Sequence, residues 1–325
     1  MTQPTDRVTV ADGVDLDAKI AGDRGAPTVI LLHGFPESAY SWRHQIPALA
    51  DAGWRVIAPD QRGYAHSAQP EGVAAYRADH LCDDVIALLD HDGADQAVVI
   101  GHDWGAIVTW HIAQRHPDRC RGIIAASVPY TPWPDTPTTV LRHQHGDDFF
   151  YINYFQEPDV PEAELDADPE RFLRAIIHVA SGEGMATLAG GSLPAAGTGC
   201  MEYFEHIAGG RPLDLPPWLS PADLAVYTEQ FTHSGFGPAI NWYRNLDANH
   251  ELFLPIGEST ITMPTGFIAG AVDPVILTRP GYVEQMNERL PHHRGNTLLP
   301  GIGHWVQQED PAGFNQAMFD LLATM

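Results

Sequence analysis

Basic residues are scarce in this sequence. Among its 325 residues, 18 are lysine or arginine and 42 are aspartate or glutamate, which gives a formal net charge of -24. Lys19 is the only lysine, and no polybasic run occurs. Nucleic acids and anionic membranes attract basic side chains, so the composition argues against both as partners. It suits a protein that acts on small neutral molecules.

The sequence also has few cysteines and lacks a long apolar run. No uninterrupted apolar stretch approaches the roughly 20 residues that span a bilayer, and residues 1–10 do not have the pattern of a secretory signal. The three cysteines are scattered, at Cys82, Cys120 and Cys200. An odd number of scattered cysteines predicts reduced thiols rather than a disulfide framework or a metal site. We therefore expect a cytoplasmic protein.

Short apolar runs alternate with amphipathic segments in residues 1–130. Strands are predicted at residues 8–10, 14–21, 28–32, 55–58, 97–100 and 122–127, with a turn at Asp12-Gly13, and helices at 77–89 and 106–115. Continuous apolar strands that alternate with helices are typical of parallel sheets buried on both faces. The pattern predicts an α/β fold, with a mostly parallel sheet flanked by helices.

This alternation is interrupted after Val128 and resumes with a strand at residues 265–269. A structureless loop of about 130 residues is implausible inside a compact domain, and the intervening stretch is rich in helix-compatible and aromatic residues. We expect a core formed by residues 1–130 and 256–325, with residues 131–255 inserted as a helical lid. Beyond residue 269, a helix is predicted at 278–290, a strand at 295–299 and a last helix at 311–324.

The run GHDWG, residues 101–105, follows a predicted strand and precedes a predicted helix. This is the arrangement of a nucleophile elbow, with Asp103 where serine usually stands. A helix-capping aspartate is the competing interpretation. A carboxylate that attacks a saturated carbon leaves an ester that water can hydrolyse, whereas serine would leave a stable ether. Asp103 therefore indicates displacement at saturated carbon through a covalent intermediate.

A histidine and a second aspartate follow in the chain order of a base and its orienting acid. His304, in GIGHW, comes after the last predicted strand, and its position distinguishes it among 17 histidines. Asp273 lies after the preceding strand, where it can accept a hydrogen bond from His304. The rival acid position, just after Ser127, offers no carboxylate.

Two histidine clusters could suggest metal ligation, at residues 143–145 and 292–293. Neither has further ligands in register, so we interpret both as solvated side chains. No metal site is expected.

The run His33-Gly34-Phe35-Pro36 follows the third predicted strand. At this point of the fold a backbone N–H completes an oxyanion hole, so we expect the N–H groups of Phe35 and Trp104 to form one. His33, Gly34 and Pro36 would shape the turn. An ordinary turn with no catalytic role is the alternative.

Together these motifs resemble those of the epoxide hydrolases of the α/β-hydrolase fold, in particular the soluble bacterial type. The resemblance covers nearly the whole chain and is carried by HGFPESAYSWRHQIPAL, PDQRGYAHS, GHDWGA, YINYFQEPDV, NWYRN and GIGHWVQQEDP. Ala65 departs from the family pattern, which usually has glycine there. This change affects the shape of a loop that is distant from the proposed chemistry.

The resemblance implies two lid tyrosines that donate to the epoxide oxygen as the ring opens, Tyr151 and Tyr243. A neutral phenol with a pKa of about 10 can make this donation at neutral pH. Tyr154, one helical turn further on, is the alternative to Tyr151. The side chains expected to contact the substrate are Phe35, Trp104, Phe155 and Trp305.

The implied reaction is hydrolysis of an epoxide to a vicinal diol, through an Asp103 ester that His304-activated water hydrolyses. Its partners are a small epoxide and water, without a metal or an organic cofactor. A homo-oligomer, the identity of the epoxide and a role in detoxification stay open at this stage.

Three alternatives differ in class or in leaving group. A haloalkane dehalogenase would share Asp103 and His304, but that family usually has Asn or Glu at the position of Phe35. A fluoroacetate dehalogenase would need arginines that clamp a carboxylate, and none closely follows Asp103. The distant alternative is a non-catalytic binding protein that reuses the fold.

Overall fold

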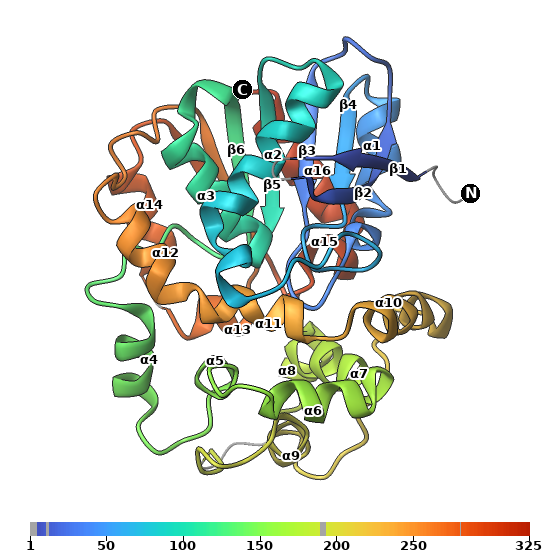
Figure 1. The fold of residues 1–325 in the computed structure, drawn as a ribbon, viewed down its shortest axis with the longest axis vertical. Helices are drawn as coiled ribbons and strands as arrows, with labels where there is room; N and C mark the ends of the chain where they lie inside the picture. Colours follow the sequence, from blue (N-terminus) through green and yellow to red (C-terminus); the bar gives the residue numbers. More distant parts are fainter. Residues whose placement is uncertain (1–4, 11–12, 189–192, 280) are drawn as a thin grey trace.

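A mostly parallel sheet forms the centre of the computed structural model, which describes residues 5–10, 13–188, 193–279 and 281–325 (Figure 1). Its strands are β1 (Thr5–Thr9), β2 (Asp15–Ala21), β3 (Thr28–Leu32), β4 (Arg55–Pro59), β5 (Ala97–His102), β6 (Cys120–Ala126), β7 (Thr265–Gly270) and β8 (His293–Leu299). The order is β1-β2-β4-β3-β5-β6-β7-β8, with β1 and β2 antiparallel and the remaining neighbours parallel. The predicted α/β-hydrolase architecture is confirmed.

The two faces of the sheet are covered by different helices. Successive side chains of a strand point to opposite faces, so Val99 packs with residues of α2 and α3, whereas Val98 and Ile100 pack with residues of α1 and α16. The helices of the core are α1 (Gln45–Asp51), α2 (Ala78–Asp92), α3 (Trp104–Arg115), α13 (Pro274–Leu277), α14 (Tyr282–Arg289), α15 (Val306–Glu309) and α16 (Pro311–Leu322).

The predicted strands are all present, with ends displaced by a few residues. The helix predicted at residues 278–290 is present as α14 but begins only at Tyr282, because Gly281 before it has a φ of 87°. Helix α1 was not predicted. At the β1–β2 turn, Gly13 has the positive φ of 71° that a tight turn requires, while Asp12 lies outside the described residues.

Between β6 and β7 the described residues form helices and loops without a further strand of the sheet. These helices are α4 (Pro137–His145), α5 (Tyr151–Tyr154), α6 (Val160–Ala167), α7 (Pro169–Ala180), α8 (Gly182–Met185), α9 (Cys200–Ile207), α10 (Pro221–Ser234), α11 (Gly237–Arg244) and α12 (Leu246–Phe253). Figure 1 shows most of them gathered beyond the end of the sheet toward which β5 points. The side chains discussed next lie at this end.

Candidate active site

Asp103 occupies a tight turn between β5 and α3. Its backbone has φ 52° and ψ -116°, a conformation that residues other than glycine rarely adopt. The turn needs glycine on either side of Asp103. A Cβ on Gly101 would lie 2.0 Å from the carbonyl oxygen of Gly105, and a Cβ on Gly105 would lie 2.1 Å from that of Leu32. The sequence GHDWG thus permits a strained turn that presents the Asp103 carboxylate beyond the sheet.

Two groups hold the Asp103 carboxylate. The backbone N–H of Phe35 donates to Oδ1 at 2.9 Å, and Nε2 of His304 lies 3.6 Å from Oδ2. Burial by itself would raise the pKa of Asp103, but His304, His102 and the Phe35 N–H outweigh it and hold the pKa below its ordinary value. The carboxylate is therefore ionised at neutral pH.

His304 lies between two carboxylates. Its Nδ1 is 3.2 and 3.3 Å from the two carboxylate oxygens of Asp273, which is fully buried and also accepts the N–H of Val275 at 2.9 Å. Burial would lower the pKa of His304, but Asp273 and Asp103 raise it well above the ordinary value. The backbone N–H of His304 donates to Ala180 of the inserted helices at 2.8 Å. The loop that carries His304 is thus hydrogen-bonded both to Asp273, which follows β7, and to Ala180, in the helices between β6 and β7.

The turn after β3 brings the Phe35 N–H to the carboxylate. A Cβ on Gly34 would lie 2.4 Å from Cβ of Asp103, so only glycine fits there. His33 accepts the N–H of Gln61 through Nε2 at 3.0 Å and donates from Nδ1 to the Gly34 carbonyl at 3.0 Å, which fixes its tautomer. Burial lowers the pKa of His33 to about 4, so this ring is neutral at neutral pH. Pro36 is buried as well.

Tyr151, from α5, and Tyr243, from α11, line one cavity together with Asp103. The centroids of the two phenol rings are 5.9 Å apart. Burial raises the pKa of both phenols above the ordinary value, so both hydroxyls keep their protons. The hydroxyl of Tyr154 donates instead to Glu164 at 2.7 Å, outside the cavity wall. The geometry therefore favours Tyr151 over Tyr154 as the second phenol.

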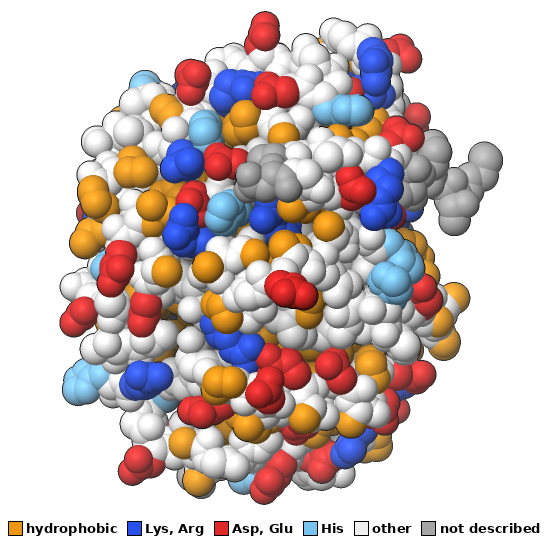
Figure 2. Space-filling model, viewed as in Figure 1, with side chains coloured by type: hydrophobic (Ala, Val, Ile, Leu, Met, Phe, Trp, Pro, Cys, Tyr) orange, Lys and Arg blue, Asp and Glu red, His pale blue; other side chains and the backbone are white. Residues whose placement is uncertain are grey.

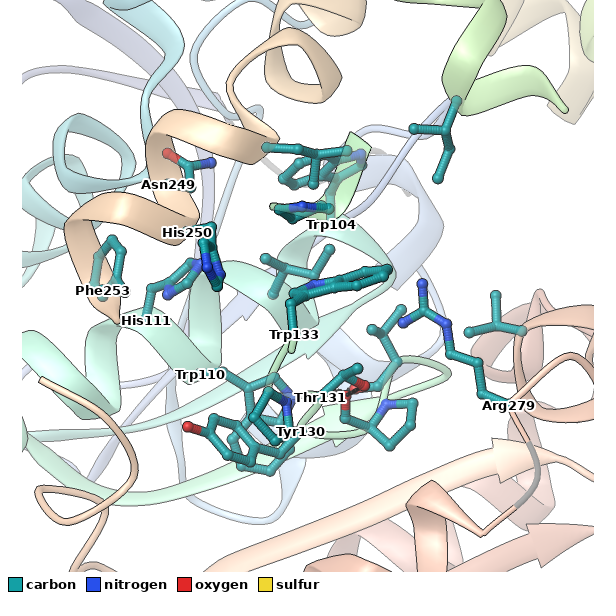
Figure 3. A pocket seen from close by; sticks show the side chains of 18 of the residues that line it. Trp104, Trp110, His111, Tyr130, Thr131, Trp133, Asn249, His250, Phe253 and Arg279 are labelled. Carbon is teal, nitrogen blue, oxygen red and sulfur yellow. Dashed lines mark hydrogen bonds between the residues drawn. The ribbon is translucent and has the colours of Figure 1, made fainter. Parts of the chain in front are cut away.

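The cavity that these residues share has a volume of about 360 Å³ and is mostly apolar (Figure 3). Trp104 lines it, as expected. Phe35, Phe155 and Trp305 do not, although all three were expected to contact the substrate. The rings of Phe35 and Phe155 pack edge-on against Tyr243, and the Trp305 indole donates to the carbonyl of Ile177 at 2.9 Å. Phe35 and Phe155 therefore support the wall from behind, whereas the Trp305 ring packs against His102 and His304.

The motif analysis missed a buried pair behind His304. Nε2 of His102 lies 2.8 Å from the backbone carbonyl oxygen of His304, and its Nδ1 lies 2.8 Å from Oε2 of Glu37. Burial would raise the pKa of Glu37, but His102 outweighs it and lowers that pKa. The His102 ring therefore bridges the Glu37 carboxylate and the backbone of His304. The pair fixes the backbone of His304.

A second carboxylate that the motif analysis missed also supports this loop. Glu309 accepts the backbone N–H groups of Gly182, Gly303 and Trp305 at 2.8, 2.9 and 2.9 Å. Gly182 belongs to the inserted helices, and the other two residues flank His304. Glu309 therefore joins the two parts of the chain next to His304. In the sequence the only signal for these roles was the presence of acidic residues inside HGFPE and GHWVQQEDP.

Comparison with known proteins agrees with this geometry. Residues 27–163 match the family described as alpha/beta hydrolase fold. The chain is 44% identical to epoxide hydrolase A of Mycobacterium tuberculosis, over 99% of this chain and 98% of that protein. It is 37% identical to epoxide hydrolase B of the same organism, over 92% of each chain. The crystal structure of epoxide hydrolase A from Mycobacterium thermoresistibile superposes with a TM-score of 0.90 at 45% identity, over 99% of this chain and 98% of the other. The chain belongs to the epoxide hydrolase family of the α/β-hydrolase fold.

Proposed function

We propose that this enzyme converts an epoxide into a vicinal diol in two steps, through an ester on Asp103. The observation that carries the proposal is the arrangement around one cavity. The ionised Asp103 carboxylate and the protonated phenols of Tyr151 and Tyr243 all line it, and His304 contacts Asp103 from behind. A nucleophile and two acids that share one apolar cavity match the needs of ring opening.

In the first step, an Asp103 oxygen attacks one ring carbon and the bond from that carbon to the epoxide oxygen breaks. Oδ1 is held by the Phe35 N–H, which leaves Oδ2 as the attacking atom. The electron pair of the broken bond moves to the epoxide oxygen. Tyr151 and Tyr243 donate hydrogen bonds to this developing alkoxide, and one of them transfers a proton to it.

In the second step, His304 removes a proton from water, and the water oxygen adds to the carbonyl carbon of the Asp103 ester. The negative charge that develops on Oδ1 is stabilised by the N–H groups of Phe35 and Trp104. The ester bond then breaks, His304 returns the proton to the leaving alkoxide, and the diol departs. The second proton of the water remains on the Asp103 carboxyl, and its transfer through solvent to the tyrosine that had lost its own proton restores both groups. Ester formation removes the Asp103 charge, one of the influences that raise the pKa of His304, so the ring becomes a base when water must be activated.

We also propose that residues 131–255 form a lid over a core made of residues 1–130 and 256–325. The helices of this segment contribute both phenols, whereas the core contributes Asp103, Asp273 and His304. The substrate would bind between the two parts, which is a common position for a ligand site.

A cytoplasmic location belongs to the same proposal. Cys82, Cys120 and Cys200 are buried free thiols, which suits a reducing compartment. Among the described ranges, no helix has the length and the apolar character that crossing a membrane demands.

The test is a side-by-side assay of diol formation from styrene oxide and halide release from a bromoalkane. We expect diol formation by the native enzyme and its loss in Asp103→Asn, because the amide is a poor nucleophile. Asp135→Asn, which changes an exposed aspartate, is the matched control and should keep the native rate. Halide release without diol would instead identify a haloalkane dehalogenase, and diol formation by Asp103→Asn would exclude the ester mechanism.

A further inference from the structure

One basic side chain, Arg279, lines the cavity beside the proposed acid Tyr151. Arg279 follows α13, and its guanidinium carbon lies 4.9 Å from the centroid of the Trp133 ring, which also lines the cavity. Figure 3 shows the Arg279 side chain and the Trp133 indole next to each other at the cavity wall. Both are only partly exposed. The indole thus holds the guanidinium at the edge of the space that the substrate would occupy.

Arg279 makes no ion pair with any carboxylate of the described residues. The other described arginines that lack a carboxylate partner, such as Arg142 and Arg294, are exposed to solvent, whereas Arg279 is only partly exposed. Glu258, an acidic residue of the same cavity wall, pairs with Arg289 at 3.2 Å. Burial lowers the pKa of Arg279 below its ordinary value, which indicates that the cation has lost part of its hydration. A partly desolvated cation without a counter-charge is costly unless a ligand supplies one.

We propose that Arg279 binds a carboxylate of the substrate, so that the preferred epoxides of this enzyme are acids with an apolar body. The proposal rests on the epoxide hydrolase function proposed above and specifies its substrate class. It also revises the expectation of neutral substrates that the overall charge suggested.

The composition of the wall favours a carboxylate over a phosphate. Arg279 is the only lysine or arginine among the described residues that line the cavity. Burial lowers the pKa of His111, another lining residue, to about 4, so its ring is neutral at neutral pH. One guanidinium matches the single charge and the planar, two-oxygen geometry of a carboxylate. A phosphate dianion would require a second cation, and the remaining wall is largely aromatic and aliphatic.

The test compares terminal epoxides of straight-chain carboxylic acids of graded length with their primary amides. An amide has the shape of the acid without its charge. We expect at least one chain length at which kcat/KM for the acid exceeds that for the amide on the order of tenfold, as for other charge-assisted hydrogen bonds. In Arg279→Gln the preference should disappear through a higher KM for the acid, with the amide unaffected. Arg279→Lys should keep part of it, and Arg142→Gln, which changes an exposed arginine, should keep all of it.

Two results would overturn the proposal. The native enzyme could lack a preference for the acid at every length, or Arg279→Gln could slow acid and amide equally, which would mean that Arg279 acts on Tyr151 or on packing. If Arg279→Gln does not fold, the salt dependence of KM of the native enzyme still tests the proposal. Added salt should raise KM for the preferred acid and leave the amide unchanged, and equal responses would refute an ionic contact. Turnover of the amides reports separately on the proposed function, because their hydrolysis does not require Arg279.

Discussion

At the scale of single residues, the chemistry depends on two phenols that face one carboxylate. Tyr151 and Tyr243 both border the cavity into which Asp103 projects, and burial keeps both protonated. Two further acidic groups line the same cavity, but Glu258 is paired with Arg289, and the hydroxyl of Tyr130 accepts a hydrogen bond from Gln114 at 3.4 Å. We therefore assign the protonation of an alkoxide formed there to Tyr151 and Tyr243.

We predict that Tyr151→Phe and Tyr243→Phe each slow ring opening on the order of a hundredfold, the lower end of the range for general acid catalysis. The double variant should be close to inactive. Tyr154→Phe is the matched control, since its hydroxyl contacts Glu164, and it should retain the native rate of ester formation. Single-turnover measurements with a chromogenic epoxide give that rate directly. A native rate in the double variant would remove both phenols from the mechanism.

Residues with a local motif could be predicted from the sequence, and those with a purely tertiary role could not. Asp103 and His304 lie in the short glycine-containing motifs GHDWG and GIGHW, so their positions at the ends of strands could be predicted. Glu37 and Glu309 act through partners far away in the chain, such as His102 and Gly182, and no local pattern encodes such contacts. Phe155 lay in a matching motif, but only the packing of its ring against Tyr243 shows that it lies behind the wall.

At the scale of elements, the junction of β5 and α3 determines where the nucleophile points. Gly101 and Gly105 at this junction pack directly against backbone atoms, and a side chain at either position would overlap these atoms. We predict that Gly105→Ala lowers the free energy of unfolding by about 3 kcal/mol, because the added Cβ would overlap the Leu32 carbonyl. Urea denaturation of Gly105→Ala measures this. Gly197→Ala is the control, since its Cβ would meet nothing within 4 Å, and equal stability of both variants would contradict the account.

The errors in element prediction have physical causes. Helix α1 is short, and it could not be distinguished from a loop by periodicity. The helix predicted at residues 278–290 starts late because Gly281 adopts a left-handed conformation that starts a new helix at Tyr282. Strands β3, β5 and β7, which precede Phe35, Asp103 and Asp273, were predictable because all of their residues are buried, which leaves continuous apolar runs.

At the scale of the whole molecule, the site exists only because distant segments meet. The loops after β3, β5, β7 and β8 bring Phe35, Asp103, Asp273 and His304 together at one end of the sheet. The inserted helices then close the cavity with Tyr151 and Tyr243. The sequence predicted that this insertion exists, from the missing alternation after Val128. Its internal packing could not be predicted, since short helices with mixed faces allow many arrangements.

The central claim is that catalysis passes through an ester on Asp103 that His304-activated water hydrolyses. The most direct measurement is intact-protein mass spectrometry of His304→Gln after exposure to a reactive epoxide. We predict an increase by the mass of one epoxide, located on Asp103 by peptide mapping and absent from Asp103→Asn/His304→Gln. His143→Gln, which changes an exposed histidine, should turn over without accumulating the adduct. A His304→Gln variant that forms diol at the native rate, or that never carries the adduct, would contradict the account.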